Sequence, residues 1–149
     1  IRASTSTSGF STSANPTASR STLVSDRDRH LFHFGTETTI GSVATQDPMF
    51  VRFSNQEDLN TYTPTATNTA GTFRLDTGNK IVAALQGKDY VFVLTDLAAY
   101  VIQFVGPPFT FSVRQVGTNC GCIAQHAASY VNGAVYWMSG VVVALYSVA

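Results

Sequence analysis

The chain has 149 residues, about the length of one domain, and it is poor in charge: charged residues make up 12% of it and the formal net charge is zero. Binding to the phosphates of DNA or RNA requires a basic face, and binding to an anionic membrane surface requires clustered lysines and arginines. The composition therefore argues against both classes. No apolar run reaches the roughly 20 residues of a membrane-spanning helix, and the N-terminus lacks the charged-then-apolar pattern of a signal peptide, so we expect neither.

Residues 1–22 form a segment rich in serine and threonine that has almost no apolar side chain to bury. Such a segment cannot by itself offset the entropy lost on ordering. We therefore predict an extended arm or linker over 1–22, ordered only where it lies over a neighbour. The rest of the chain, 23–149, is predicted to form the folded domain.

From residue 23 onward strand patterns dominate the sequence. An aromatic strand is predicted over 30–36 (HLFHFGT) and an alternating one over 49–54 (MFVRFS), in which successive side chains point to opposite faces. Residues 55–71 are mostly polar and turn-forming. They predict a long loop with at most one helical turn at 57–59.

Tight turns separate the strands of the second half. Asn132-Gly133 stands between two apolar runs within 128–138, and it is the strongest hairpin signal in the sequence because both residues tolerate a positive φ. The other strands are predicted over 73–77, 81–86, 90–95, 98–105, 109–116 and 141–149.

These strands contain a weak internal repeat. Residues 89–103 align with 133–147 at an offset of about 44 residues, and 30–35 resembles the first strand of both copies. A period of roughly 40–45 residues is typical of a four-stranded propeller blade, although a sandwich or another meander gives a similar pattern. We therefore predict an all-β fold of antiparallel β-meanders, interpreted as incomplete β-propeller blades. Because a propeller needs at least four blades, we expect further chain or other copies to complete it.

Charge is almost absent from the second half. Between Leu97 and Ala149 the only formally charged side chain is Arg114. A free surface this neutral promotes association, and interface cores are depleted of charge. We expect this part to be buried, either in its own core or, as the preferred interpretation, against neighbouring chains.

Asp26, Asp28 and His30 form the clearest candidate for a metal site. They alternate, so a strand there would place two carboxylates and an imidazole on one face, and such a set can hold a divalent ion. The competing interpretation is a solvated strand entry in which neighbouring arginines neutralise the carboxylates. His33 would lie on the opposite face, so the ligands do not converge and we predict no metal site.

Cys120 and Cys122 are too close in sequence for an unstrained disulfide. Zinc requires four ligands, and His126 is the only nearby candidate for a third. We predict free, buried thiols that pack as small hydrophobic groups.

No strong catalytic motif is present. The sequence lacks a G-x-S-x-G elbow and a glycine-rich phosphate loop, and its nine acidic residues single out no pair of the kind that a glycosidase uses. Asp76-Thr77-Gly78 matches only a fragment of the Asp-box turn of sialidases and is predicted to be an ordinary turn. We therefore predict no catalytic, cofactor-binding or metal-binding residue, and no enzyme.

Aromatic residues are numerous in the predicted strands and allow two interpretations. They could form a platform on which sugars or bases stack. Alternatively they pack within and between sheets beside valine and isoleucine, which their period-two spacing favours. The residues are Phe92, Tyr100, Phe104, Phe109, Phe111, Tyr136, Trp137 and Tyr146.

In four segments the sequence resembles the stretch shared by the tail nozzle or tail tubular proteins of tailed bacteriophages, also called packaged-DNA stabilisation or tail hub proteins. The segments are 26–36 (DRDRHLFHFGT), 47–64 (DPMFVRFSNQEDLNTYTP), 106–117 (GPPFTFSVRQVG) and 128–138 (ASYVNGAVYWM), within a resemblance that covers about residues 23–140. The sequence departs from the family pattern after Trp137-Met138, where VVVALYSVA replaces the expected turns and aromatic strand, and in the serine- and threonine-rich N-terminus.

The resemblance implies a structural protein of the phage virion. Such proteins are similar to β-propeller rings whose copies surround the axial DNA channel of the tail, retain the packaged genome and pass it during ejection. We therefore expect a homo-oligomeric ring in contact with other phage tail proteins, assembled in the host cytoplasm, with DNA passing nearby without sequence-specific binding. The alternatives are a carbohydrate-binding or carbohydrate-cleaving propeller, such as an adhesin for host glycans, and a bacterial propeller that serves as an interaction scaffold.

Overall fold

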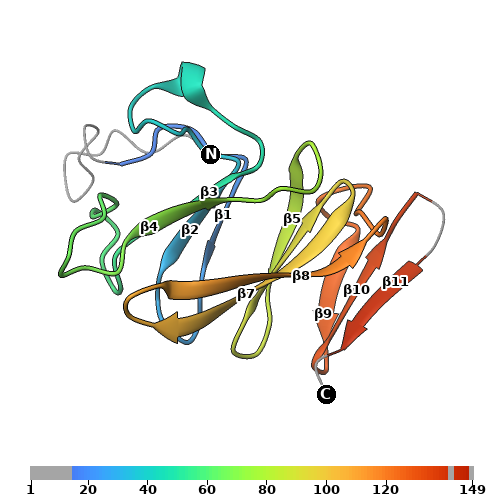
Figure 1. Ribbon diagram of the computed structural model, residues 1–149. Helices are drawn as coiled ribbons and strands as arrows, with labels where there is room; N and C mark the ends of the chain where they lie inside the picture. The colour runs from blue at the N-terminus through green and yellow to red at the C-terminus, as the bar shows by residue number, and fades with distance from the viewer. Residues whose placement is uncertain (1–14, 141–142, 148–149) are drawn as a thin grey trace. The chain divides into compact units, whose positions relative to one another are not determined.

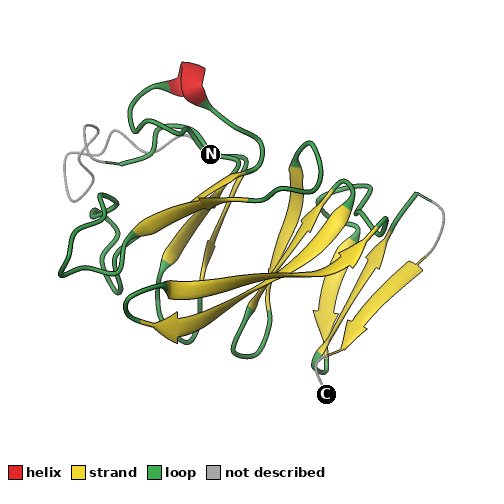
Figure 2. Cartoon of the chain, in the orientation of Figure 1, coloured by secondary structure: helices red, strands yellow, loops and turns green. Residues whose placement is uncertain are grey.

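The computed structural model describes residues 15–140 and 143–147, and in this part of the chain the fold is all-β (Figure 1). Eleven strands form three antiparallel sheets, and the only helical element described is one 3-10 turn, η1 (Val43–Thr45). Figure 2 shows strands and loops with a single helical turn, and in each sheet the strands follow one another in chain order, which confirms the prediction of antiparallel meanders. The chain divides into two compact units, residues 1–76 and 77–149.

The first unit contains one four-stranded meander. Its strands are β1 (Ser21–Val24), β2 (Leu31–Phe34), β3 (Phe50–Phe53) and β4 (Gly71–Arg74). Alternation in β2 sends Phe32 and Phe34 into the core, where both are fully buried. Phe32 contacts the ring of Phe53 from β3, so the core of this unit is largely aromatic.

The second unit contains two meanders. The first is formed by β5 (Ile81–Gln86), β6 (Val91–Thr95), β7 (Ala98–Gly106) and β8 (Thr110–Thr118), and the second by β9 (Ala128–Val131), β10 (Ala134–Met138) and β11 (Val143–Ser147). The predicted hairpin at Asn132-Gly133 is confirmed: φ is 50° and 81° at these residues, and they join β9 to β10.

The internal repeat corresponds to equivalent strands. Residues 89–103 contain β6 and the start of β7, and 133–147 contain β10 and β11, so each copy supplies the second and third strands of a meander. Residues 30–35 contain β2, which is also a second strand. The repeat therefore marks three successive meanders.

Two local predictions are wrong. Residues 57–59 do not form a helical turn; Glu57 has a φ of 56°, and the carboxylate of Asp58 instead accepts hydrogen bonds from Asn60 N at 2.9 Å and Thr61 Oγ1 at 2.6 Å. Strand β4 begins at Gly71, two residues before the predicted strand, because the pairing with β3 extends to Phe53 opposite Gly71. The ring of Phe53 lies where a Cβ of residue 71 would be, so this position needs a glycine.

Residues 20–22 pair with the first sheet. Arg20 N donates to the carbonyl of Phe34 at 2.9 Å, and β1 begins at Ser21, within the segment predicted to be an arm. Residues 1–14 of that segment lie outside the described residues. Nowhere in the described part of the chain is there a helix long and apolar enough to cross a bilayer.

Candidate functional site

A buried polar cluster in the first unit surrounds Glu37. Thr17 donates to both carboxylate oxygens of Glu37, from its backbone N at 2.8 Å and its hydroxyl at 2.7 Å, and Gly41 N donates at 2.8 Å. Arg52 of β3 donates to the carbonyl oxygens of Glu37 and Thr38. These bonds fasten residue 17 and the loop after β2 to the sheet, so the cluster is structural.

No pattern in the sequence indicated that Glu37 would be buried. Burial by itself would raise the pKa of its carboxyl group, but the hydrogen bonds from Thr17 and Gly41 and the charge of Arg52 outweigh burial and hold that pKa below its usual value. A buried carboxylate whose acceptor sites are filled by the fold is not available as a catalytic base.

His30 and His33 are both held in the neutral form. Burial lowers the pKa of each to about 4, and the charge of Arg52 contributes further at His33. The ring of His33 shares a 3.0 Å hydrogen bond with Tyr62 Oη, and Nε2 of His30 lies 3.0 Å from Thr69 Oγ1. These contacts join the long loop to β2.

We expect the stability of the first unit to fall as the pH is lowered from about 6.5 to about 4. The two imidazoles take up protons in the unfolded chain near pH 6.5 but in the folded chain only near 4, so their contribution is complete above 6.5 and is lost on acidification. The lowered pKa of each histidine corresponds to roughly 3 kcal/mol of unfolding free energy. Urea unfolding at a series of pH values between 8 and 4.5 measures this loss of unfolding free energy.

His33→Gln is the variant that tests the cause. It removes one of the two imidazoles, so the pH dependence of the urea midpoint between 6.5 and 4.5 should shrink by about half. A midpoint that is constant over this range in the unmodified protein would contradict the assignment.

The Asp26, Asp28 and His30 candidate does not form the expected strand. Residues 25–30 are the turn between β1 and β2, closed by Arg29 N donating to the carbonyl of Ser25 at 2.9 Å, and Arg29 has a φ of 52°. The interpretation as a solvated segment is wrong for Asp28 and His30, which are buried, whereas Asp26 and the two neighbouring arginines are exposed. Among the described residues, no three His, Cys, Asp or Glu side chains are grouped so that they could hold a metal ion.

Both cysteines are free thiols, and Cys122 is buried in the core of the second unit as predicted. Burial raises the pKa of both thiols, which disfavours the reactive thiolate. Cys120 is only half-buried and packs at the edge of the same core. The geometry supports a packing role for both.

Asp76-Thr77-Gly78 is followed by a tightly held turn. The carboxylate of Asp96 accepts hydrogen bonds from Asn79 N at 2.7 Å and Asn79 Nδ2 at 3.1 Å, and Thr95 Oγ1 donates to the carbonyl of Thr77 at 2.9 Å. The predicted turn is confirmed for Thr77 and Gly78, which lie within the bend at 77–80, while Asp76 precedes it.

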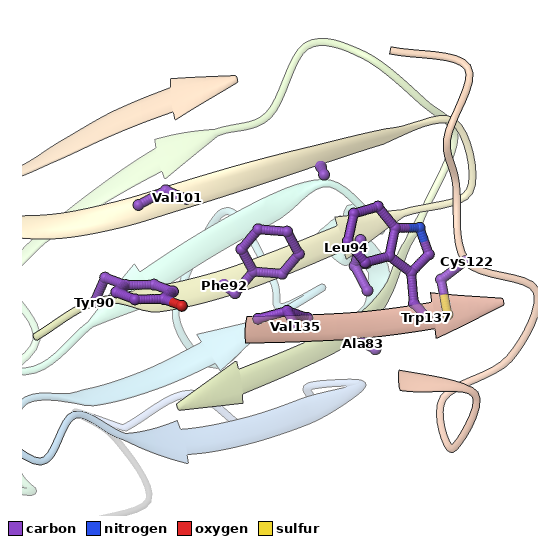
Figure 3. Close-up of a cluster of buried hydrophobic side chains, with 9 residues drawn as sticks. Ala83, Tyr90, Phe92, Leu94, Val101, Cys122, Val135 and Trp137 are labelled. Atoms are coloured by element: carbon purple, nitrogen blue, oxygen red, sulfur yellow. The ribbon is translucent and has the colours of Figure 1, made fainter. Parts of the chain in front are cut away.

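The core of the second unit lies between its two meanders. Phe92 of β6 is fully buried, with its ring centroid 5.4 Å from that of Trp137 in β10 and 5.1 Å from that of Tyr146 in β11. Figure 3 shows Phe92 and Leu94 beside Val135 and Trp137 in this cluster. For these aromatic residues the packing interpretation is correct.

The opposite face of the β9–β11 sheet is apolar and exposed. We call it the outer face and define it by Val131 of β9, Tyr136 and Met138 of β10, and Val143 and Leu145 of β11, all of which are exposed. Cross-strand pairing places Tyr136 beside Leu145 and Met138 beside Val143, so the side chains form one patch. This face of the uncharged second half is therefore not buried in the protein's own core, and its burial against neighbouring chains stays a prediction.

A shallow pocket of about 270 Å³ opens on the outer face. Its walls carry no acidic residue; they are formed by His126, Ala127, Ala128, Ser129, Tyr136, Trp137, Met138 and Val143. A site that cleaves sugars uses a pair of carboxyl groups, and this pocket has none. The pocket can accept an apolar group and offers little to a charged one.

A second exposed apolar surface is the β7–β8 tip, which we define as residues 103–112. It extends past the end of β6, whose pairing with β7 stops at Ile102. The rings of Phe104 and Phe111 pack edge to face within the tip at 5.6 Å, while Phe109 is 79% exposed. Phe109 therefore does not pack in the core of the single chain, and packing against another sheet stays a prediction for this residue.

The comparisons with known proteins do not assign the chain to a family. No protein-family model matches the sequence, and no curated protein gives a significant match.

Proposed function

We propose that this protein is a structural component of a phage virion tail, at the nozzle or the end of the tail tube. In this proposal several copies form a ring around the DNA channel, which retains the packaged genome and lets it pass during ejection. The chain acts without catalysis, assembles in the host cytoplasm and contacts other tail proteins. The resemblance of residues 23–140 to the tail nozzle family is the origin of the proposal.

The observation that carries the proposal is the combination of successive antiparallel meanders with an exposed apolar surface free of charge. Meanders of four strands that follow in chain order are the units from which propellers are built. The outer face and the β7–β8 tip contain no charged residue, a composition typical of interface cores rather than free surfaces.

The near neutrality of the chain suits a channel through which DNA moves. A basic wall would bind the phosphates by releasing counterions and would hold the DNA, whereas a neutral wall allows it to slide. The formal net charge of zero therefore favours a passage over a DNA-binding site.

The second candidate is a carbohydrate-binding adhesin, and the exposed ring of Tyr136 beside the pocket is the observation that favours it. Stable recognition of sugars also uses polar groups that fix the hydroxyls, and the pocket walls supply few. A glycan array with several classes of bacterial surface sugar separates the candidates, because binding that Tyr136→Ala abolishes would favour the adhesin.

We expect the purified protein to form a symmetric multimer of one chain type. Sedimentation velocity and light scattering give its mass over a range of concentrations, and negative-stain images show whether the particles are rings. A monomer at every concentration up to the solubility limit would contradict the proposal. Antibodies against the chain should also label one end of the tail when applied to intact virions.

A further inference from the structure

The internal repeat extends to the register of individual side chains. In the first copy Phe92 pairs with Val101 and Leu94 with Ala99, across β6 and β7. At the repeat offset the equivalent pairs are Tyr136 with Leu145 and Met138 with Val143, and β10 and β11 pair in this register. The outer face of the β9–β11 sheet is therefore equivalent to the face of the β5–β8 sheet that carries Phe92.

The two equivalent faces differ in what covers them. Phe92, Leu94, Ala99 and Val101 are at most 5% exposed because the next meander, β9–β11, packs on them. Their equivalents Tyr136, Met138, Val143 and Leu145 are 44%, 50%, 68% and 56% exposed. The chain therefore already covers one such face, that of the β5–β8 sheet, with an apolar β-sheet. By the same equivalence, we expect a β element with an apolar surface to cover the outer face.

The same chain presents such an element. The β7–β8 tip is an antiparallel two-stranded ribbon that carries the most exposed large hydrophobic side chain among the described residues, Phe109, together with the exposed Val105. Neither the tip nor the outer face has a charge that would have to be desolvated on contact. A phenyl ring is smaller than the pocket of about 270 Å³ beside Val143.

We propose that the outer face of the β9–β11 sheet is the docking surface for a second copy of this chain, which inserts Phe109 of its β7–β8 tip into the pocket beside Met138 and Val143. The two surfaces of the contact are different, so each copy keeps one free tip and one free outer face for further copies. A head-to-tail contact of this kind builds rings when the rotation closes. The inference rests on the proposed multimer and names the surfaces that join its subunits.

Two variants each remove one side of the contact. Phe109→Ser removes the inserted ring, and Val143→Lys places a charge at the pocket, so each is expected to weaken self-association roughly 30-fold or more, as is typical for a residue at the centre of an interface. Sedimentation velocity measures the effect. Val43→Lys, on the exposed η1 turn of the first unit, is the matched control for added charge and should leave association unchanged.

Mixing the two variants gives the decisive measurement. Phe109→Ser keeps an intact outer face and Val143→Lys keeps an intact tip, so the mixture should form a one-to-one complex although each variant alone is monomeric. A mixture that stays monomeric while both variants are folded by circular dichroism would overturn the head-to-tail contact. If Val143→Lys does not fold, Met138→Gln at the same pocket takes its place.

The outcomes separate this inference from the proposed function. If both single variants assemble as the unmodified protein does, the docking surface is wrong while the multimer stands. If the unmodified protein is a monomer at every concentration, the multimer itself is contradicted, and the docking surface with it.

Discussion

Replacing Gly121 with alanine is expected to destabilise the second unit by at least ~3 kcal/mol, at the upper end of the cost of inserting one methyl group into a packed site. A Cβ at this position would overlap the carbonyl oxygen of Asp96 and lie 2.5 Å from the backbone N of Leu97. Both obstacles are main-chain atoms that cannot rotate away. The unfolding free energy from urea titration measures the effect.

The close approach at Gly121 has a structural cause. The segment after β8 crosses the turn between β6 and β7, where Cys120 N donates to the carbonyl of Leu97 at 3.2 Å and Cys122 N to that of Thr95 at 3.0 Å. Because the segment donates to the turn from the residues on both sides of Gly121, the two backbones lie too close to leave room for a side chain.

Gly140 provides the matched control for this prediction. Among the residues that the structure describes, a Cβ there would meet only Ile123 Cγ2, at the ordinary contact distance of 3.9 Å. Gly140→Ala should therefore change the unfolding free energy by less than about 1 kcal/mol. Equal losses in the two variants would show that the crossing at Asp96 is looser than described.

Truncating Phe92 to alanine is the second change with a large expected effect, a loss of about 3–5 kcal/mol of unfolding free energy. Phe92 is fully buried, and its ring contacts Trp137 and Tyr146, which belong to the other meander. The variant removes the ring at the centre of the apolar cluster that the two sheets of the second unit share. Urea unfolding gives the free energy.

The loss in Phe92→Ala should be concentrated between the sheets. Amide hydrogen exchange in β10 and β11 is expected to accelerate more than exchange in β2, which lies in the other unit. Phe92→Leu keeps most of the apolar volume and should cost less than half as much. A cost below about 1 kcal/mol for the alanine variant would show that the cavity collapses or that the two sheets are not joined through this ring.

Local pattern was sufficient to predict most of the strands. Strand β5 matches the predicted 81–86, and β9 and β10 lie on either side of the predicted hairpin, because apolar alternation and the turn chemistry of Asn132-Gly133 act over a few residues. The turn before β5 was predictable for the same reason, and the buried Cys122 because a free thiol packs as a small hydrophobic group.

The candidate sites were harder to predict because they depend on segments that are distant in sequence. The burial of Glu37 is stabilised by Thr17, 20 residues earlier, and His33 contacts Tyr62, 29 residues later. Asp26, Asp28 and His30 fit a strand by alternation, but the hydrogen bonds that close the β1–β2 hairpin make a turn of them. No periodicity within one segment encodes such contacts.

The sequence by itself determined the fold class, the meander order and the repeat of this protein, since strand pairing between neighbours is set by local alternation and short turns. Only the tertiary structure decided which faces are covered. Phe92 and Tyr136 are aromatic residues at equivalent repeat positions, yet Phe92 is packed beneath the next meander and Tyr136 is exposed. The physical reason is that burial depends on whether another sheet packs on a face. A strand shows the same alternation of side chains whether its face is covered or exposed.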